Sequence, residues 1–293
     1  MGATRWMATA ILAVMLAGPV AAEVEQFGNM EPGKGRLLRQ RIKDGEVVKG
    51  TFVVMAINQA IPKLLKRVGL DFYILDVEHQ PIDHSMTAAM INASRHAGIA
   101  SWVRVVDVDK NISLMLDFGA DGVVVPMVET REQAEKLVYY GRHKPEGGRN
   151  ISTGSNQVDF QIVPDTKAWL AQRNREVSLI IMIESQKGID NIDEIFSVPG
   201  IDGCVIGTGD LAYDIGHAGD LKHPAVEAAV EQIMEAGLRH GIWVATVIRR
   251  PEDVAPWARR ENHNVLVLGA GYRMLAIGAE LFNKAVDEAL AAD

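Results

Sequence analysis

The run Leu179-Ile180-Ile181-Met182-Ile183 ends in Glu184, and the next apolar run, Gly203-Cys204-Val205-Ile206-Gly207, is followed by Asp210. Two earlier runs have the same form. Asp71-Phe72-Tyr73-Ile74-Leu75 ends in Asp76-Val77-Glu78-His79, and Ser101-Trp102-Val103-Arg104-Val105-Val106 contains Arg104. Charged side chains rarely occupy strand-like positions without a partner or a ligand. If these runs are neighbouring parallel strands, their ends converge on the face where a parallel barrel builds its active site.

Apolar strand-like runs alternate with helix-patterned segments along the rest of the chain. We expect eight strands, at residues 50–55, 71–76, 101–106, 122–126, 179–184, 202–207, 242–247 and 264–269. Helical periodicity falls at residues 37–41, 61–68, 86–96, 112–118, 131–140, 189–196, 225–240, 254–259 and 274–290. This unbroken alternation predicts a single α/β domain, a (β/α)₈ TIM barrel. A doubly wound open sheet is the competing fold, but the first strand-to-helix turn lacks the glycine fingerprint of a dinucleotide site.

The N-terminus has the pattern of a secretory signal peptide. Residues 1–22 contain Arg5, an apolar stretch over residues 7–16, and Val20-Ala21-Ala22 before Glu23. The apolar stretch is too short for a comfortable transmembrane helix. We therefore expect residues 1–22 to be removed, leaving a barrel domain at residues 23–293 that is exported to the periplasm and does not insert into the membrane. A short uncleaved anchor and a start codon placed too far upstream are the alternatives.

The composition limits the partners of the chain. Of 293 residues, 48% are hydrophobic and 23% charged, which is typical of a globular protein, and the formal net charge is −8. Removal of residues 1–22 takes away only Arg5 among charged residues and changes the net charge to −9. An acidic chain is a poor candidate for binding nucleic acid, and we read the pairs Arg249-Arg250 and Arg259-Arg260 as solvated helix faces. Cys204, the single cysteine, lies in an apolar run and is expected to be a buried small hydrophobe.

The longest interruption of the pattern lies between Gly141 and Ser178. It begins with a loop rich in Gly, Ser and Asn and contains a short helix-like piece near residues 167–172. A segment of this length could fold over the barrel mouth and cover the site. Because it follows a helix rather than a strand, a place at the opposite face is the alternative.

Four side chains could carry chemistry at the strand ends. Glu184 and Asp210 end consecutive strands, so their carboxylates could share Mg²⁺, Mn²⁺ or Co²⁺, or could simply cap the helices that follow. Arg104 in its apolar run needs an anion or developing oxyanion, or a salt bridge to Asp76 or Glu78. His79 could titrate near neutrality beside Glu78, although a structural role is the commoner one for such a histidine.

A Schiff-base mechanism would need a lysine in a strand or at its mouth. The eight expected strands contain none, and Lys187, just after Glu184, is the remaining candidate. The residues therefore favour metal-assisted acid/base chemistry on an oxygen-rich anion.

From about Gly50 to Leu281 the chain resembles the HpcH/HpaI family of metal-dependent 2-oxo-acid aldolases, which is related to the citrate lyase β subunit. The resemblance is carried by several motifs in the same order along the chain: Asp76-Val77-Glu78-His79-Gln80-Pro81, Val103-Arg104-Val105, the stretch from Leu116-Asp117-Phe118-Gly119-Ala120-Asp121 to Pro126-Met127-Val128, Ile183-Glu184, and Ile206-Gly207-Thr208-Gly209-Asp210-Leu211.

The resemblance implies a barrel of the phosphoenolpyruvate/pyruvate-binding type with a divalent metal on Glu184 and Asp210. It further implies that Arg104 holds the enolate oxygen of pyruvate, and that backbone amides near Gly209 and Asp210 hold its carboxylate. His79, with Asp117 as its partner, would relay a proton through water at the cleaved carbon. Members often form trimers or hexamers in which the final helix packs on a neighbour.

Three departures from the family pattern concern the substrate. Thr208 stands where many members have proline, Asn150 follows Arg149 where glycine or serine is commoner, and Gly271 replaces an aspartate frequent in sugar-acid aldolases. We predict a metal-dependent lyase that cleaves a 4-hydroxy-2-oxo acid, a small-molecule substrate, to pyruvate and an aldehyde. The rivals are a lyase of the citrate or malyl type acting on a CoA thioester, and an exported oxo-acid-binding protein without turnover.

Overall fold

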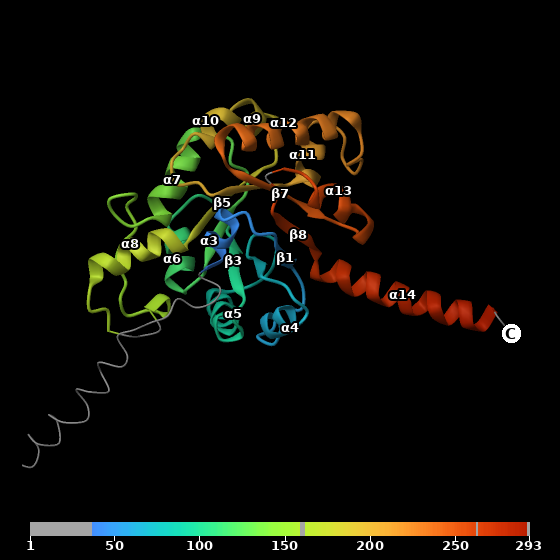
Figure 1. Ribbon diagram of the computed structural model, residues 1–293, viewed down its shortest axis with the longest axis horizontal. Helices are drawn as coiled ribbons and strands as arrows, with labels where there is room; N and C mark the ends of the chain where they lie inside the picture. Colours follow the sequence, from blue (N-terminus) through green and yellow to red (C-terminus); the bar gives the residue numbers. More distant parts are fainter. Residues whose placement is uncertain (1–36, 159–161, 262, 292–293) are drawn as a thin grey trace, which may run out of the picture.

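Eight parallel strands pair in chain order and close into a barrel in the computed structural model, which describes residues 37–158, 162–261 and 263–291 (Figure 1). The strands are β1 (Val48–Val53), β2 (Phe72–Asp76), β3 (Ala100–Arg104), β4 (Gly122–Val125), β5 (Ser178–Ile183), β6 (Gly203–Ile206), β7 (Trp243–Ile248) and β8 (Val265–Ala270). The predicted (β/α)₈ barrel is confirmed. The predicted signal peptide, residues 1–22, lies outside the described residues.

Helices follow the strands and surround the barrel (Figure 1). They are α3 (Leu38–Lys43), α4 (Ile61–Arg67), α5 (His84–Ala97), α6 (Asn111–Asp117), α7 (Arg131–Gly141), α8 (Thr166–Glu176), α9 (Gln186–Asp190), α10 (Ile192–Phe196), α11 (Thr208–Asp214), α12 (Pro224–His240), α13 (Val254–Ala258) and α14 (Gly271–Ala291). None of the helices described is long and apolar enough to cross a membrane.

Two element predictions need correction. The helix expected at residues 189–196 is split into α9 and α10, because Asn191 ends one helix and begins the next in a non-helical conformation. Strand β1 begins at Val48, two residues earlier than expected, and so contains Lys49. The Lys49 side chain is exposed at the amino end of the strand, so this correction adds no lysine to the mouth.

Large aromatic side chains fill the inside of the barrel. The rings of Phe72 and Trp102 lie 4.3 Å apart between centroids, and Trp102 stacks on Trp243 at 5.8 Å. Their bulk requires glycine opposite them, because a Cβ at Gly50 would overlap the Phe72 ring and one at Gly203 would overlap that of Trp243. The interior is therefore a packed core rather than a pore.

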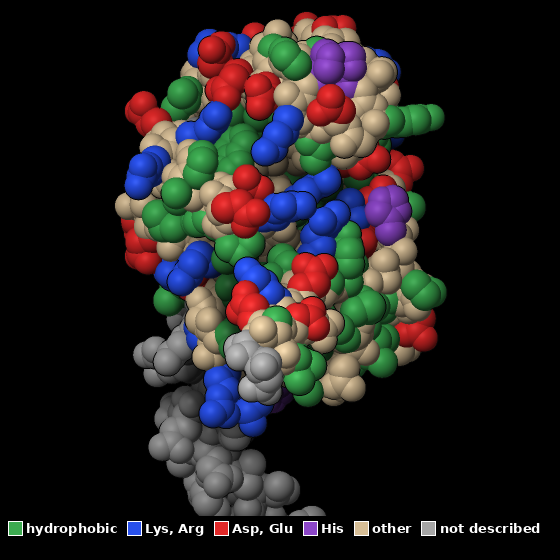
Figure 2. All heavy atoms as spheres, turned by 90° about the vertical axis from the view of Figure 1, so that its right-hand side faces the viewer, with side chains coloured by type: hydrophobic (Ala, Val, Ile, Leu, Met, Phe, Trp, Pro, Cys, Tyr) green, Lys and Arg blue, Asp and Glu red, His purple; other side chains and the backbone are tan. Residues whose placement is uncertain are grey.

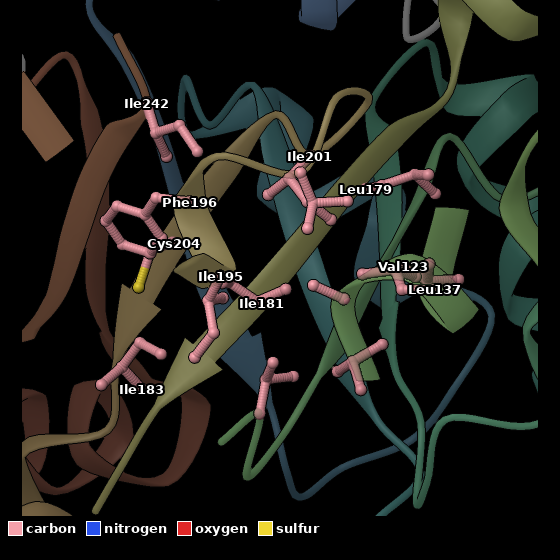
Figure 3. Close-up of a cluster of buried hydrophobic side chains, with 14 of the residues drawn as sticks. Val123, Leu137, Leu179, Ile181, Ile183, Ile195, Phe196, Ile201, Cys204 and Ile242 are labelled. Carbon is pink, nitrogen blue, oxygen red and sulfur yellow. The ribbon is translucent and has the colours of Figure 1, made fainter. Parts of the chain in front are cut away.

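The outer faces of the strands pack against the surrounding helices in a second apolar layer. Leu179, Ile181 and Ile183 of β5 alternate with the inward residues and meet Ile195 and Phe196 of α10 (Figure 3). Cys204 lies fully buried in this layer, where burial raises the pKa of its thiol. The thiol therefore has the buried, apolar role expected from the sequence.

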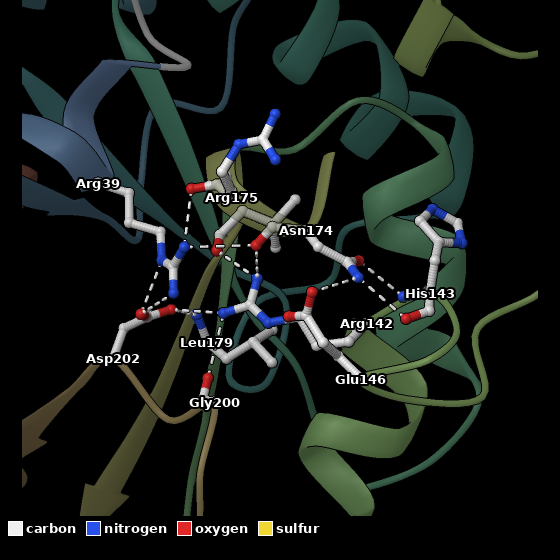
Figure 4. Close-up of polar contacts among 10 residues, drawn as sticks. Arg39, Arg142, His143, Glu146, Asn174, Arg175, Leu179, Gly200 and Asp202 are labelled. Atoms are coloured by element: carbon white, nitrogen blue, oxygen red, sulfur yellow. Dashed lines mark hydrogen bonds and ion pairs between the residues drawn. The ribbon is translucent and has the colours of Figure 1, made fainter. Parts of the chain in front are cut away.

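The segment between α7 and β5 lies at the amino end of the barrel, where it contacts α3. Arg39 of α3 donates to the carbonyl oxygens of Asn174 and Arg175, and Arg142 donates to those of Asn174 and Val177 (Figure 4). The idea that the described part of this segment covers the barrel mouth is wrong. Since α7 returns the chain to the amino ends of the strands, the segment stays there.

Asp202 links this segment to the barrel. Its carboxylate accepts hydrogen bonds from Arg39 Nε (2.7 Å), Arg142 Nη2 (2.7 Å) and the Leu179 amide (2.9 Å) (Figure 4). The Arg142 side chain is 1% exposed and that of Asp202 is 5% exposed. Removing one charge from so buried a pair leaves the other uncompensated.

We predict that Asp202→Asn lowers the free energy of unfolding by about 3 kcal/mol, as for other broken buried ion pairs. Asp193→Asn is the matched control, because Asp193 pairs with Arg239 but is 62% exposed. It should change the value by less than about 1 kcal/mol. Urea unfolding curves measure both, and equal midpoints for the two variants would contradict the assignment.

Candidate functional site

An ion pair between neighbouring strands lies at the carboxyl end of the barrel. Asp76 of β2 is the register partner of Arg104 of β3. Arg104 donates to the two carboxylate oxygens of Asp76, from Nε at 3.0 Å and from Nη2 at 2.7 Å. Both side chains continue the inward alternation of their strands, after Ile74 and Trp102. The salt bridge considered as an alternative role for Arg104 is therefore present, and Arg104 also lines the cavity at the mouth.

The turn after β2 is built on the same carboxylate. The amides of Glu78 and His79 donate to Asp76 Oδ1 at 3.1 and 3.3 Å. Glu78 Oε2 lies 3.2 Å from Arg104 Nη1 and 3.5 Å from His79 Nε2. Burial raises the pKa of Glu78 against the opposing charge of Arg104. The His79 side chain is 60% exposed, so it is placed to exchange protons with water.

Glu184 follows β5 and points inward after Ile180 and Met182. Its Oε2 accepts a hydrogen bond of 2.9 Å from the amide of Met127, which has a positive φ of 50° that few non-glycine residues adopt. Its Oε1 lies against Gly207, where any Cβ would overlap it. Burial raises the pKa of Glu184 to about 7, and the negative charge of Asp210 contributes.

Asp210 lies in the first turn of α11, directly after β6. Among the residues described, its exposed carboxylate makes no hydrogen bond or ion pair. The helix has no side-chain cap at Gly207, so the first amide groups of α11 also lack a partner of this kind. The two carboxylates therefore follow neighbouring strands, as predicted, beside the first turn of α11.

These side chains share one cavity of about 180 Å³. Its polar wall comes from Arg104 of β3, Glu184 after β5 and Asp210 after β6. Its apolar wall comes from Phe52, Val54, Met182, Val247 and Ala270. The structure thus shows the predicted convergence for Arg104 and the two carboxylates, whereas His79 is not among the described residues that line this cavity.

The structure does not bring Asp117 to His79 within the chain. Asp117 ends α6, and its Oδ1 accepts from Arg149 Nη2 at 2.6 Å and from Gln157 Nε2 at 3.1 Å. The partner that lies near His79 is Glu78. A role for Asp117 beside His79 therefore has no support from the contacts of a single copy.

Two arginines at the mouth were not predicted from the sequence. Arg249 follows β7 and continues the inward alternation of Trp243, Ala245 and Val247, so its interpretation as a solvated helix face is wrong. Arg273, in the first turn of α14, lines the same cavity. Arg249 follows an apolar run just as Glu184 does, and this pattern indicates a place at the barrel mouth.

Glu184 and Asp210 are the carboxylates that would hold a divalent cation. No group of three or more His, Cys, Asp or Glu side chains in the described ranges is arranged to hold a metal. Glu184 and Asp210 nevertheless supply two carboxylates whose charges repel, one of them buried with its pKa raised. Mg²⁺ and similar hard cations are commonly held by one or two carboxylates together with water and substrate oxygens. The residues fit such an ion.

A parallel barrel with acids and arginines converging at its carboxyl end defines an α/β-barrel enzyme. The pattern of the HpcH/HpaI aldolase/citrate lyase family matches residues 50–269, and the chain belongs to that family. It is 33% identical over 225 residues, 76% of this chain and 83% of the relative, to a 5-keto-4-deoxy-D-glucarate aldolase of Klebsiella pneumoniae. The chain is thus an enzyme of a family of aldolases and lyases.

Solved structures agree with this assignment. An HpcH/HpaI aldolase from Desulfitobacterium hafniense is similar with a TM-score of 0.81 and 26% identity, covering 86% of this chain and 96% of that one. The citrate synthase SbnG is similar with a TM-score of 0.75 and 29% identity, covering 85% and 98%. The same fold therefore carries more than one named activity.

Proposed function

We propose that the protein is a divalent-metal-dependent lyase that cleaves a 4-hydroxy-2-oxo acid to pyruvate and an aldehyde. The observation that carries this proposal is the placement of Glu184 and Asp210 just after the consecutive strands β5 and β6, in a cavity that Arg104 also lines. The aldolase names of relatives at about one-third identity support the reaction class. Mg²⁺, Mn²⁺ and Co²⁺ all suit the oxygen donors.

Glu184 and Asp210 would hold the cation, which supplies Lewis-acid polarisation of the substrate's keto group. The amides of Gly209 and Asp210, in the first turn of a helix that no described side chain caps, suit the neighbouring carboxylate of the oxo acid. The substrate's carboxylate and keto oxygens would thus face the ends of β5 and β6. In this orientation the keto oxygen would also face Arg104 on the opposite side of the cavity.

Arg104 stabilises negative charge on the keto oxygen as the carbon–carbon bond breaks. Asp76 fixes its guanidinium through Nε and Nη2, and Glu78 Oε2 lies 3.2 Å from Nη1, so the group is held in one orientation at the cavity that it lines. A guanidinium group that is fixed before the reaction needs no reorganisation during it. Asp76 is therefore a positioning residue for Arg104.

His79 takes the proton of the hydroxyl at C4 through water. The C3–C4 bond then breaks, C4 becomes the aldehyde carbon, and the electron pair forms the enolate of pyruvate, whose oxygen faces Arg104. The protonated His79 returns this proton through water to C3, which releases pyruvate and restores the base. Glu78 Oε2, 3.5 Å from His79 Nε2, is placed to orient the imidazole.

Activity should depend on a divalent cation held by Glu184 and Asp210. We expect Glu184→Gln, Asp210→Asn and Gly207→Ala to lower pyruvate release at least 100-fold, the last because its methyl group would displace Glu184 Oε1. Tyr213→Phe, in the same helix as Asp210 but 75% exposed and outside the cavity, is the control for the fold and should stay within a few-fold of wild type. Pyruvate release in a coupled assay, with and without chelator, measures the effects.

Full turnover in excess chelator, or trapping of a lysine adduct by borohydride, would rule this mechanism out. Lys187 is a poor amine for such an adduct, because its Nζ pairs with Glu129 at 3.0 Å and its side chain is 60% exposed. Cleavage restricted to CoA thioesters would favour the citrate or malyl type of lyase instead. Binding of oxo acids without any turnover would favour a binding protein.

The roles of Arg104 and His79 separate in a second assay. Enolate formation needs Arg104, whereas cleavage also needs the proton relay at C4. Arg104→Met should therefore lose both cleavage and hydrogen exchange at the pyruvate methyl group, by about 100-fold or more. His79→Gln should lose cleavage at least tenfold more than exchange. Proportional losses of the two reactions in both variants would show that the roles are not divided in this way.

Helix α14 supports the proposal that the protein is a homo-oligomer, a trimer or hexamer. It begins at the end of β8 and projects away from the barrel (Figure 1), and none of its residues is buried. Large apolar side chains on it are exposed, among them Leu281 (65%), Phe282 (78%) and Leu290 (72%). Exposed apolar side chains gathered on one element often mark a protein–protein contact, and a second copy would bury them.

The N-terminal pattern supports the proposal of export to the periplasm, with a mature chain that begins at Glu23. Native mass spectrometry of the protein from a periplasmic fraction tests both proposals in one measurement. We expect a trimer or hexamer whose subunit mass corresponds to residues 23–293. Subunits with an intact Met1 would exclude cleavage, and a monomer at micromolar concentration would exclude the role given to α14.

A further inference from the structure

Arg249 and Arg273 form a second cationic pair in the cavity that the proposed mechanism does not use. Arg249 follows β7 and Arg273 lies at the start of α14. In a closed barrel of eight strands, β7 lies opposite β3, which carries Arg104. Figure 2 shows the face from which α14 projects, with Lys and Arg side chains gathered near its middle beside acidic ones. The cavity thus has guanidinium groups on two opposite walls.

This second pair lacks an acidic partner. Over the ranges that the structure describes, Arg249 makes no hydrogen bond or ion pair, and Arg273 donates to the hydroxyl of its neighbour Tyr272 at 3.0 Å. Arg104 and Arg142, by contrast, each pair with a buried aspartate. Burial, and then the positive charge of Arg273, lower the pKa of Arg249, while Tyr272 and the carboxylate of Asp210 act in the opposite direction. Two half-buried cations that repel each other at one cavity create a place for an anion.

The position of this pair relative to the cleaved bond follows from the cavity. Arg249 Nη2 lies 3.3 Å from the place of a Cβ on Gly209, so it covers the first turn of α11 from the β7 side. Glu184 and Arg104 face the pyruvate half of the substrate from β5 and β3. The cavity continues from there toward β7, β8 and α14, where the two arginines lie, and this side has room for substrate atoms beyond C4.

We propose that Arg249 and Arg273 bind an anionic group, a carboxylate or phosphate ester, on the half of the substrate that is released as the aldehyde. The inference rests on the proposed function for the position of the cleaved bond. Guanidinium groups bind either anion through paired N–H donors. The two arginines would thus select substrates by the charge of the aldehyde half rather than by its length.

The test uses aldol addition of pyruvate to three 2-hydroxyaldehydes that differ only in the substituent on the hydroxyl-bearing carbon. They are 2-hydroxy-3-oxopropanoate with a carboxylate, glyceraldehyde 3-phosphate with a phosphomethyl group, and glyceraldehyde with a hydroxymethyl group. Wild-type enzyme should prefer one of the two anionic aldehydes over glyceraldehyde at least tenfold in kcat/KM. The preferred one identifies the anion.

Arg249→Met and Arg273→Met should each lower this preference about 10- to 100-fold, the loss expected for a charge-assisted hydrogen-bond pair. Arg249→Lys should recover part of it. Arg250→Met is the matched control, because Arg250 is the next residue in the chain, 72% exposed, and 3.6 Å from Glu252. It should keep the wild-type preference.

A binding measurement separates this inference from the proposed function. Calorimetric titration with tartronate, in the presence of pyruvate, reports the anion site without turnover. Weaker binding by at least tenfold in Arg249→Met and Arg273→Met, but not in Arg250→Met, supports the site even if the wild type cleaves nothing. Unchanged tartronate binding and unchanged preference would overturn it. So would a raised KM for pyruvate in methyl exchange, which would mean that the arginines hold the pyruvate carboxylate.

Discussion

The ion pair between Asp76 and Arg104 determines the geometry of the barrel mouth. One buried carboxylate accepts two hydrogen bonds from the guanidinium and two from backbone amides of the following turn. The position of Arg104 and the path of the chain toward His79 therefore depend on the same four contacts. A buried pair of this kind contributes little net stability compared with an apolar pair, so its value lies in fixing orientation.

Much of this arrangement could be predicted from strand periodicity. In a parallel barrel the side chains alternate between the interior and the helical layer, so a charged residue two positions after an inward apolar one points into the mouth. Glu184 and Arg104 follow Met182 and Trp102 in this way. Asp210 was found by its place after the next strand, since helix α11 begins there.

Other features depend on contacts that periodicity does not encode. Asp117 is separated from His79 because Arg149 and Gln157, which come from the loop after α7, bind its carboxylate. The place of that loop follows from Asp202, whose partners are more than 20 residues away in sequence. Arg249 was misassigned for a different reason: its doublet with Arg250 suggested a helix surface, whereas the strand before it extends to Ile248.

The aromatic packing inside the barrel determines how ligands enter and leave the site. Phe72, Trp102 and Trp243, with Leu38 and Ile42 of α3 beneath them, close the amino end of the interior. The cavity is therefore blind on that side, and ligands pass through the mouth alone. A molecule that binds deep against Glu184 and Arg104 must arrive before anything that lies above it, and must depart after it. The architecture thereby imposes an ordered sequence in which the ligand that binds last is released first.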